Sequence, residues 1–241
     1  MNEPVRICLV GAGRVARVHA QSLTRHLPGA EIVAVVDPAA EARRSLAQEF
    51  AIPAQYAALE EALEKESTQA VVITTPTPSH APLAVQAASR GQHIFLEKPM
   101  ALSLAECDVI LQACHQNGVL LQLGFMRRFD PEFNTALGKI EAGEIGQPMM
   151  IKSLTHGPGL PPPWARDLQT SNGMLAEVNS HDWDTLRWLM GDEYDRVYAE
   201  VANLKGAALQ VDTPNFYDNA LVNVRFRRGG LGMISGICSL M

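Results

Sequence analysis

The residues best suited to chemistry include a lysine that directly follows an apolar run. Lys98 stands between Glu97 and Pro99, at what we expect to be the end of a strand. An ammonium group there can donate a hydrogen bond to a substrate oxygen and stabilise negative charge as hydride leaves. Taken alone, a Glu-Lys pair at a strand end is also compatible with solvated surface.

His181 is the second candidate, because histidine titrates near neutral pH and suits removal of a hydroxyl proton. Glu177 precedes it by one turn of a predicted helix, so the two side chains would share a face. Asp182 and Asp184 flank it and could raise its basicity or orient its ring. A core or capping histidine is the alternative. Adding His156 makes only a weak metal-ligand set, and we predict no metal site.

A glycine-rich segment follows the first apolar run, Ile7–Val10, and fits the pattern G-x-G-x-x-A. Gly11 allows a tight turn from strand to helix, and Gly13 lets the backbone approach a pyrophosphate. Ala16 is small enough for close packing of the helix on the strand. The positive end of that helix would face the phosphates. This segment predicts a dinucleotide site.

Asp37 ends a second apolar run, Ile32–Val36, where this fold places its ribose-binding carboxylate. A carboxylate there accepts hydrogen bonds from the ribose hydroxyls and repels a 2′-phosphate, which favours NAD over NADP. The alternative is that Asp37-Pro38 caps the next helix, with Pro38 in its first turn. Arg43 and Arg44 keep NADP possible, because a nearby arginine can accept the extra phosphate.

The loop after a third strand, 70–74, would also border the ligand, because open sheets bind ligands at the carboxyl ends of their strands. In that loop His80 either lines the cofactor site or has a capping or packing role. Arg127, beside Arg128, either meets a phosphate or carboxylate or forms a surface pair. We assign cofactor binding to Gly11, Ala12, Gly13, Arg14, Val15, Asp37, Thr75, Pro76, His80, Glu97, Lys98 and Arg127.

Strands and helices alternate from 7 to 124, which predicts a doubly wound parallel sheet of the Rossmann type. The pattern then changes to helices at 131–144 and 176–190 and strands at 147–155, 196–203, 220–227 and 231–239, the last two forming a hairpin. We therefore expect a nucleotide-binding domain over 1–124. A substrate-binding α+β domain with a mixed or antiparallel sheet would follow over 125–241.

The composition excludes several classes of protein. The 241 residues are 47% hydrophobic and 19% charged, which is typical of a globular protein, and the net charge is −6. Without a basic stripe, nucleic-acid binding is not expected, and no stretch approaches a membrane span. The four cysteines are scattered and lack C-x-x-C spacing, which favours a reducing, cytoplasmic location.

Four segments together resemble one family, the Gfo/Idh/MocA oxidoreductases, and within it the inositol-oxidising members. They are Gly11–Ala20, Thr75–Thr77, Glu97–Pro99 and Gly124–Asp130. The last of these, GFMRRFD, is the most specific, and the resemblance extends over the whole chain.

The resemblance implies NAD(P)-dependent oxidation of a sugar, polyol or cyclitol hydroxyl. Lys98 would bind and activate the hydroxyl group, and His181 would act as general base. The family's D-x-x-x-H pattern maps onto Glu177 and His181. Glutamate in place of aspartate moves the carboxylate by about 1.5 Å, which bears on substrate choice. The alternative is a nucleotide-binding sensor or regulatory protein without turnover.

The family also implies further strands and a terminal helix beyond Met241. The sequence therefore predicts a truncated second domain with an incomplete sheet. An apolar edge or face exposed on such a sheet favours association. We accordingly expect a homo-oligomer formed through the sheet of the second domain.

Overall fold

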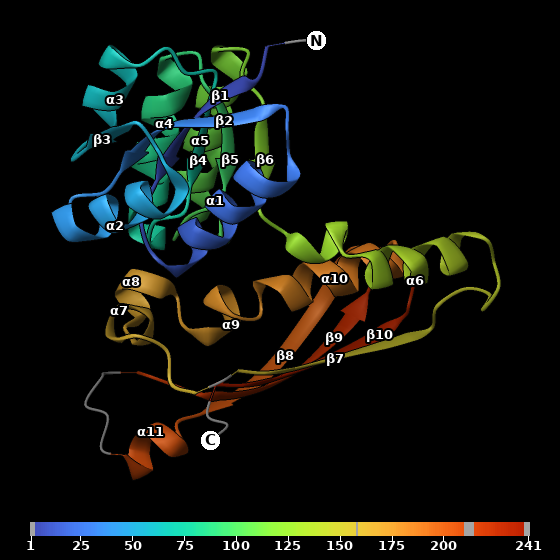
Figure 1. The fold of residues 1–241 in the computed structure, drawn as a ribbon. Coiled ribbons are helices and arrows are strands. Elements are labelled where there is room, and N and C mark those ends of the chain that lie inside the picture. Colours follow the sequence, from blue (N-terminus) through green and yellow to red (C-terminus); the bar gives the residue numbers. More distant parts are fainter. Residues whose placement is uncertain (1–2, 158, 210–214, 239–241) are drawn as a thin grey trace. The chain divides into compact units, whose positions relative to one another are not determined.

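The structure is a computed structural model that describes residues 3–157, 159–209 and 215–238. The chain divides into two compact units, Met1–Gly124 and Phe125–Met241 (Figure 1). The division falls at the boundary expected from the change in pattern after residue 124.

The first unit contains a six-stranded parallel sheet with strand order β3-β2-β1-β4-β5-β6. The order reverses direction at β1, which makes the sheet doubly wound, as predicted. The strands are β1 (Val5–Val10), β2 (Ala30–Val36), β3 (Ala54–Tyr56), β4 (Ala70–Ile73), β5 (His93–Leu96) and β6 (Leu121–Leu123).

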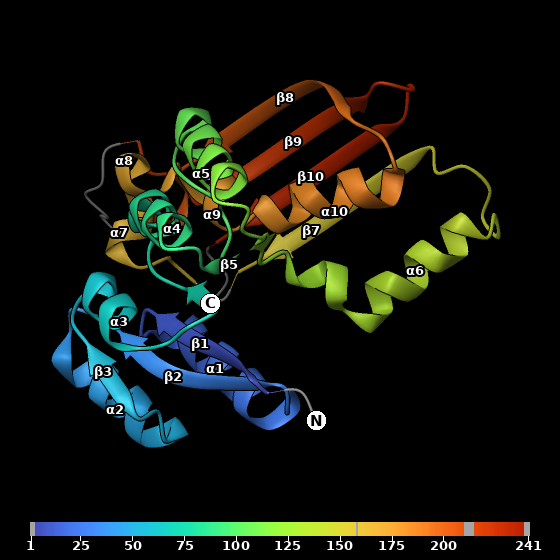
Figure 2. The ribbon, with the colours of Figure 1, turned by 90° about the horizontal axis from the view of Figure 1, so that it is seen from above.

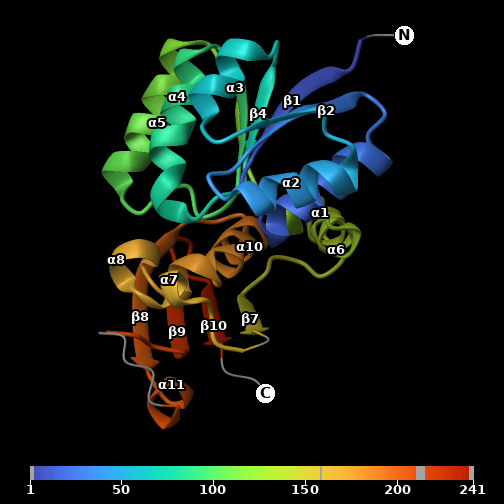
Figure 3. The same ribbon diagram turned by 60° about the vertical axis from the view of Figure 1, so that its left-hand side comes forward.

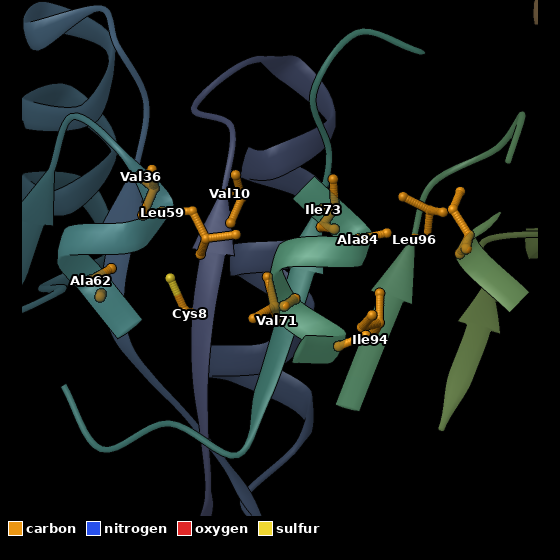
Figure 4. Packing of buried hydrophobic residues seen from close by; sticks show 14 of the residues in the cluster. Cys8, Val10, Val36, Leu59, Ala62, Val71, Ile73, Ala84, Ile94 and Leu96 are labelled. Carbon is orange, nitrogen blue, oxygen red and sulfur yellow. The ribbon is translucent and has the colours of Figure 1, made fainter. Parts of the chain in front are cut away.

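Helices cover both faces of this sheet, because its central strands are apolar on both sides. In β1, Ile7 and Leu9 pack with α1 (Arg14–His26) and α2 (Ala40–Phe50). Cys8 and Val10 point to the opposite face, toward α3 (Leu59–Lys65), α4 (His80–Ser89) and α5 (Leu104–Gln116) (Figure 4). Continuous apolar runs are typical of parallel strands buried on both faces.

Local signals in the sequence set several helix ends. Ser103 caps α5 and forms the predicted capping box with Glu106. Gly91 and Gly118 follow α4 and α5 with positive φ angles, as expected for helix-terminating glycines. The alternative that Pro38 lies in the first turn of the next helix is wrong, because α2 begins only at Ala40 and its N-cap is Ala39.

The turn between β1 and α1 requires glycine at its first position. Gly11 has a φ of +99°, and a Cβ atom there would lie 2.7 Å from Thr74 Oγ1. At Gly13 a Cβ atom would meet nothing within 4 Å, and φ is −81°. The fold of the unit therefore demands glycine at 11 but not at 13.

The second unit contains a four-stranded mixed sheet of order β7-β10-β9-β8 (Figure 2). The strands are β7 (Met150–His156), β8 (Tyr194–Ala202), β9 (Asn219–Phe226) and β10 (Leu231–Ile237). The predicted hairpin is β9 and β10, which pair antiparallel, whereas β10 and β7 run parallel. Ser239, the predicted end of the last strand, lies outside the described residues.

One helix, α10 (Ser180–Met190), covers one face of the second sheet. Leu186 and Met190 of α10 pack against alternate residues of β9 and against Ile234 of β10. The unit begins with η2 (Met126–Phe129) and α6 (Pro131–Glu141), which Asp130 caps. Three short helices, α7 (Pro163–Arg166), α8 (Leu168–Ser171) and α9 (Met174–Glu177), precede α10. The short helix α11 (Lys205–Ala208) follows β8 (Figure 3).

The helix predicted over 176–190 is wrong in its first turn. The segment forms α9, which ends at Glu177, and then α10, which begins at Ser180. Asn179 is fully buried between them and its backbone carbonyl accepts hydrogen bonds from Asp182 and Trp183. Glu177 and His181 therefore do not belong to one continuous helix, and their spacing alone does not place them on one helical face.

The other face of the second sheet exposes apolar side chains. By strand register, Leu221 of β9 lies beside Ser235 of β10, which lies beside Leu154 of β7. Leu221 and Leu154 are 58% and 65% exposed. Leu231, Met150 and Tyr198 share this face and are exposed as well. No helix among the described residues is long and apolar enough to cross a membrane.

We predict that Gly11→Ala destabilises the protein by about 1–3 kcal/mol, because it combines an unfavourable φ with a contact against the Thr74 backbone. Urea unfolding of wild type and variant measures the change. Gly13→Ala is the matched control. Its free energy of unfolding should fall by no more than a fraction of this amount, since the added Cβ atom would contact nothing within 4 Å. Equal destabilisation by the two substitutions would contradict the assignment.

Candidate functional site

In the first unit, the predicted site residues follow the carboxyl ends of neighbouring strands. The parallel hydrogen-bond ladder extends one residue beyond each strand. Gly11 N donates to Val36 O at 2.8 Å and Thr74 N to Val10 O at 2.8 Å, while Glu97 N donates to Ile73 O at 3.0 Å. The glycine-rich turn, the Thr75 loop and the Lys98 loop thus start from one hydrogen-bonded edge.

The start of α1 fits a dinucleotide phosphate. Gly13 is the N-cap and supplies no side-chain cap, so the first-turn amides of Arg14, Val15 and Ala16 have no partner within a helix. Such amides, with the helix dipole, bind anions. The unfilled space beside Gly13 leaves room for a ligand at that point. Ala16 is fully buried, as expected for close packing of α1 on the sheet.

Asp37 is oriented by the backbone around it. Its Oδ2 accepts from Ala12 N and its Oδ1 accepts from Ala39 N, both at 2.8 Å. The side chain thus joins the glycine-rich turn to the start of α2, while each oxygen keeps capacity for another hydrogen bond. The carboxylate is therefore held ready to accept from ribose hydroxyls.

The two arginines that could admit a 2′-phosphate already have partners. The Arg43 guanidinium donates to the carbonyl oxygens of Asp37 and Pro38, at 3.0 and 3.3 Å. Arg44 forms an ion pair with Glu41 at 2.6 Å. Both guanidinium groups are therefore engaged within the first unit.

Lys98 follows β5 and is half-buried, and its peptide bond to Pro99 is cis. Its neighbour Glu97 binds His19 of the same unit, with Glu97 Oε1 2.7 Å from His19 Nε2. Burial would raise the pKa of the Glu97 carboxyl, but the His19 hydrogen bond and charge, with the Lys98 amide and ammonium, hold the pKa below its ordinary value. Glu97 is therefore a carboxylate that supports the lysine loop.

His80 is 1% exposed, which places it inside the loop rather than on its surface. Nδ1 lies 2.8 Å from Pro99 O, and Nε2 lies 2.8 Å from Thr75 O. These contacts support the packing role over direct contact with a cofactor. Thr75 and Pro76 form the start of the same loop, and the Ser79 hydroxyl bonds to the Thr75 hydroxyl at 2.8 Å.

In the second unit, His181 is in the first turn of α10 and is partly buried. Its ring makes an edge contact with Phe125, with centroids 6.3 Å apart. Its carbonyl accepts from the Thr185 hydroxyl at 2.6 Å. Glu177, the last residue of α9, is also partly buried. The half-buried imidazole and carboxyl group stand on either side of the break between α9 and α10.

Asp182, next to His181, is a fully buried carboxylate with four hydrogen-bond donors. Oδ1 accepts from Ser153 Oγ at 2.6 Å, Thr155 Oγ1 at 2.8 Å and Arg127 at 2.7 Å. Oδ2 accepts from the Asn179 amide at 2.7 Å. Burial favours the neutral acid, but these hydrogen bonds together lower the pKa of Asp182. The charge therefore fastens β7, η2 and the start of α10 to one another.

The arginine pair of the GFMRRFD segment binds two aspartates of α10. Arg128 forms two hydrogen bonds of 2.8 Å with Asp184 and lies over the Trp188 ring. Arg127 binds Asp182 and has an 18% exposed side chain, so it is not a solvated surface residue. Both aspartates of α10 thus bind arginines of η2.

Some important residues escaped the sequence analysis. The sequence patterns assign no role to His19, which lies within the segment Gly11–Ala20, and none to Ser153, Thr155 or Asn179. For His19 the available signal is its position in the helix that directly follows the glycine-rich turn. The other three are common polar residues whose convergence on Asp182 depends on tertiary folding. The described residues contain no cluster of His, Cys, Asp or Glu suited to a metal ion.

We predict that Asp182→Asn lowers stability at about pH 7 by about 3–5 kcal/mol, since it leaves Arg127 without its buried counter-charge. A carboxyl group with a lowered folded pKa stabilises above its unfolded pKa of about 3.9, and this contribution is lost as pH falls through the folded pKa. The difference between variant and wild type should therefore shrink in acid. Urea unfolding across pH tests this.

Asp195→Asn provides the control for this experiment, because Asp195 is exposed on β8. Its substitution should change stability little at any pH. A loss for Asp182→Asn that stays constant as the pH falls would contradict the proposed ionisation of Asp182.

Both units match known families of sequence. Residues 5–125 match the oxidoreductase family with an NAD-binding Rossmann fold, and residues 133–239 match the GFO/IDH/MocA C-terminal domain. The predicted Rossmann fold, nicotinamide cofactor and oxidoreductase class are thereby confirmed.

Named relatives agree with this. The chain is 35% identical over 237 residues to scyllo-inositol 2-dehydrogenase (NAD(+)) of Bacillus subtilis, covering 96% of this chain and 67% of that protein. It is 30% identical over 230 residues to myo-inositol 2-dehydrogenase of Thermotoga maritima, covering 95% and 67%.

Among solved structures, GenD2 of gentamicin A biosynthesis, in complex with NAD, is similar with a TM-score of 0.91 and 26% identity. The match covers 100% of this chain and 68% of that one. The chain thus spans about two thirds of the length of these relatives. It belongs to the Gfo/Idh/MocA oxidoreductase family.

Proposed function

We propose that the protein oxidises a ring hydroxyl of a cyclitol, or of a related polyol or sugar, and transfers the hydride to NAD. The observation that carries the proposal is the edge of the first sheet. There the glycine-rich turn, Asp37 and Lys98 follow the strands β1, β2 and β5 of one parallel sheet. This is where open α/β sheets bind dinucleotides.

The cofactor assignment rests on Asp37 and the start of α1. The uncapped amides of α1 would bind the pyrophosphate. Asp37, oriented by Ala12 and Ala39, would accept from the adenosine ribose and repel a 2′-phosphate. With Arg43 and Arg44 engaged elsewhere, NAD is favoured over NADP.

Oxidation of a hydroxyl group requires stabilisation of the oxygen as hydride leaves and removal of the hydroxyl proton, and the chain has a residue suited to each task. Bound NAD would accept hydride from the carbon that carries the hydroxyl group. Lys98 would donate a hydrogen bond to the hydroxyl oxygen and stabilise the negative charge that develops on it. His181 would remove the hydroxyl proton, and Glu177 would orient the base or bind the substrate. The carbon–oxygen double bond forms as proton and hydride leave.

The substrate class follows from the relatives. Two of them carry the names scyllo-inositol and myo-inositol 2-dehydrogenase. We therefore expect a cyclitol with several hydroxyl groups as the substrate.

The location is a separate proposal. The four free cysteines agree with a reducing, cytoplasmic setting.

A spectrophotometric assay of NADH formation tests this function directly. Wild type, offered inositol isomers and common sugars with NAD or NADP, should turn over a cyclitol with NAD. Lys98→Ala should lower turnover by at least about 100-fold, since it removes the hydrogen bond to the developing oxyanion, while NAD binding measured by calorimetry survives. Lys139→Ala, an exposed lysine on α6, is the control.

Two outcomes would overturn parts of the proposal. NAD binding without turnover of any substrate would favour a nucleotide sensor of the same fold. A failure to bind either nucleotide would refute the cofactor assignment itself.

We further propose that copies of the chain associate through the exposed face of the second sheet. This face carries the apolar side chains Leu221, Leu154, Leu231, Met150 and Tyr198. Contiguous apolar patches of this kind are typical of interaction surfaces.

Light scattering tests the association. Leu221→Lys should reduce the mass of the wild-type oligomer, because it places a charge on the sheet face proposed as the interface between copies. Leu104→Lys changes an 84% exposed residue on α5 and should leave the mass unchanged. A wild-type monomer at high concentration would contradict this proposal.

A further inference from the structure

Two histidines from different helices bind the residues on either side of Lys98. His19 belongs to α1, which follows the glycine-rich turn, and it contacts Glu97. His80 begins α4, which follows the Thr75 loop, and it contacts Pro99. The lysine therefore stands between two tethered neighbours.

The contact on the Glu97 side is short and well enclosed. His19 Nε2 lies 2.7 Å from Glu97 Oε1, and their side chains are 23% and 17% exposed. The imidazole also makes an edge contact with the Phe95 ring, with centroids 5.0 Å apart. Glu97 Oε2 accepts from the Lys98 amide at 3.2 Å. The chain of contacts runs from α1 through a carboxylate to the lysine backbone.

Gly124 lies directly against the Glu97 carboxylate. A Cβ atom at Gly124 would lie 3.0 Å from both Cδ and Oε1 of Glu97. Gly124 is buried and its amide donates to Leu96 O at 2.8 Å. The carboxylate is thus confined between the His19 ring and the end of β6, and it cannot swing freely.

The contact on the Pro99 side joins two loops. Both ring nitrogens of the buried His80 face carbonyl oxygens at 2.8 Å, one of Pro99 and one of Thr75. The ring nitrogen that carries the proton donates to the carbonyl it faces, and the ring fills the space between the two carbonyl groups. His80 thereby sets the separation between the loop after β4 and the loop after β5.

We propose that His19 and His80 are positioning residues that hold Lys98 in its reactive geometry and couple it to the two cofactor-binding loops. The inference rests on the proposed function of Lys98. Because His19 contacts Glu97, directly before the lysine, its loss should act on the chemical step. Because His80 also holds Thr75, its loss should act on cofactor affinity as well.

The His19 arm of the test compares three variants. His19→Ala should lower kcat by about 10–100-fold, as a displacement near 1 Å can cost about 100-fold in rate. The Kd for NAD should change little. His19→Gln should restore most of kcat, since its amide can donate to Glu97. His26→Ala, an exposed histidine at the end of α1, is the matched control and should match wild type.

The His80 arm uses His80→Gln, whose single terminal amide group cannot face two separate carbonyls as the two ring nitrogens do. It should lower kcat and also weaken NAD binding. Circular dichroism and thermal unfolding establish first that the variant is folded. If it is not, the His19 arm alone decides the proposal.

A chemical readout separates failure of this inference from failure of the proposed function. Acetylation of Lys98 by a lysine-selective reagent, followed by mass spectrometry, does not require turnover. In His19→Ala the labelling rate of Lys98 should change severalfold, while that of exposed Lys139 stays constant. An inactive wild type would refute the function only. Unchanged kcat and unchanged Lys98 labelling in His19→Ala would refute the positioning role.

Discussion

The parallel hydrogen-bond ladder of the first sheet is the constraint on which the nucleotide-binding unit depends. It does not stop at the strand ends, because Gly11, Thr74 and Glu97 each donate to the last residue of a neighbouring strand. Segments distant in the sequence are thereby aligned at one edge, with their loops starting at the same level. The close approach of Gly11 to Thr74 follows from this alignment, since the turn leaves β1 directly against the end of β4. A chemical site built on such an edge inherits the rigidity of the core below it.

The second unit is organised around a buried charge. Asp182 would be unfavourable in the interior alone, and it is stabilised because donors from β7, η2 and Asn179 surround it. The geometry of these donors fixes α10 against β7 and η2, and His181 takes its place on the same first helical turn. Arg128 and Asp184 repeat the connection farther along α10. The arginine pair of the GFMRRFD segment thus holds η2 against α10 in this unit.

The two units use motif residues in a similar way. Residues that a sequence motif suggests for ligand binding often bind the protein itself, as Glu97, His80 and Arg127 do. This is expected where a catalytic group must be held within a fraction of an ångström, because its neighbours need fixed rotamers and satisfied hydrogen bonds. Asp37 also binds the protein itself, since its oxygens accept from two backbone amides, and each oxygen retains capacity for a further hydrogen bond.

The sequence by itself determined the parallel sheet, the turn at Gly11, the capping box of α5 and the change of architecture after residue 124. These depend on local features, namely apolar periodicity, glycine and capping residues, that act within a few positions. It also indicated Lys98 and Asp37, because each directly follows a recognisable strand. The helix predicted from the sequence over 176–190 is broken between α9 and α10, where Asn179 is buried although the sequence pattern is continuously helical. Only the tertiary structure decided the partners of Asp182, Glu97 and His80, since hydrogen bonds between residues remote in sequence depend on how the strands and helices pack.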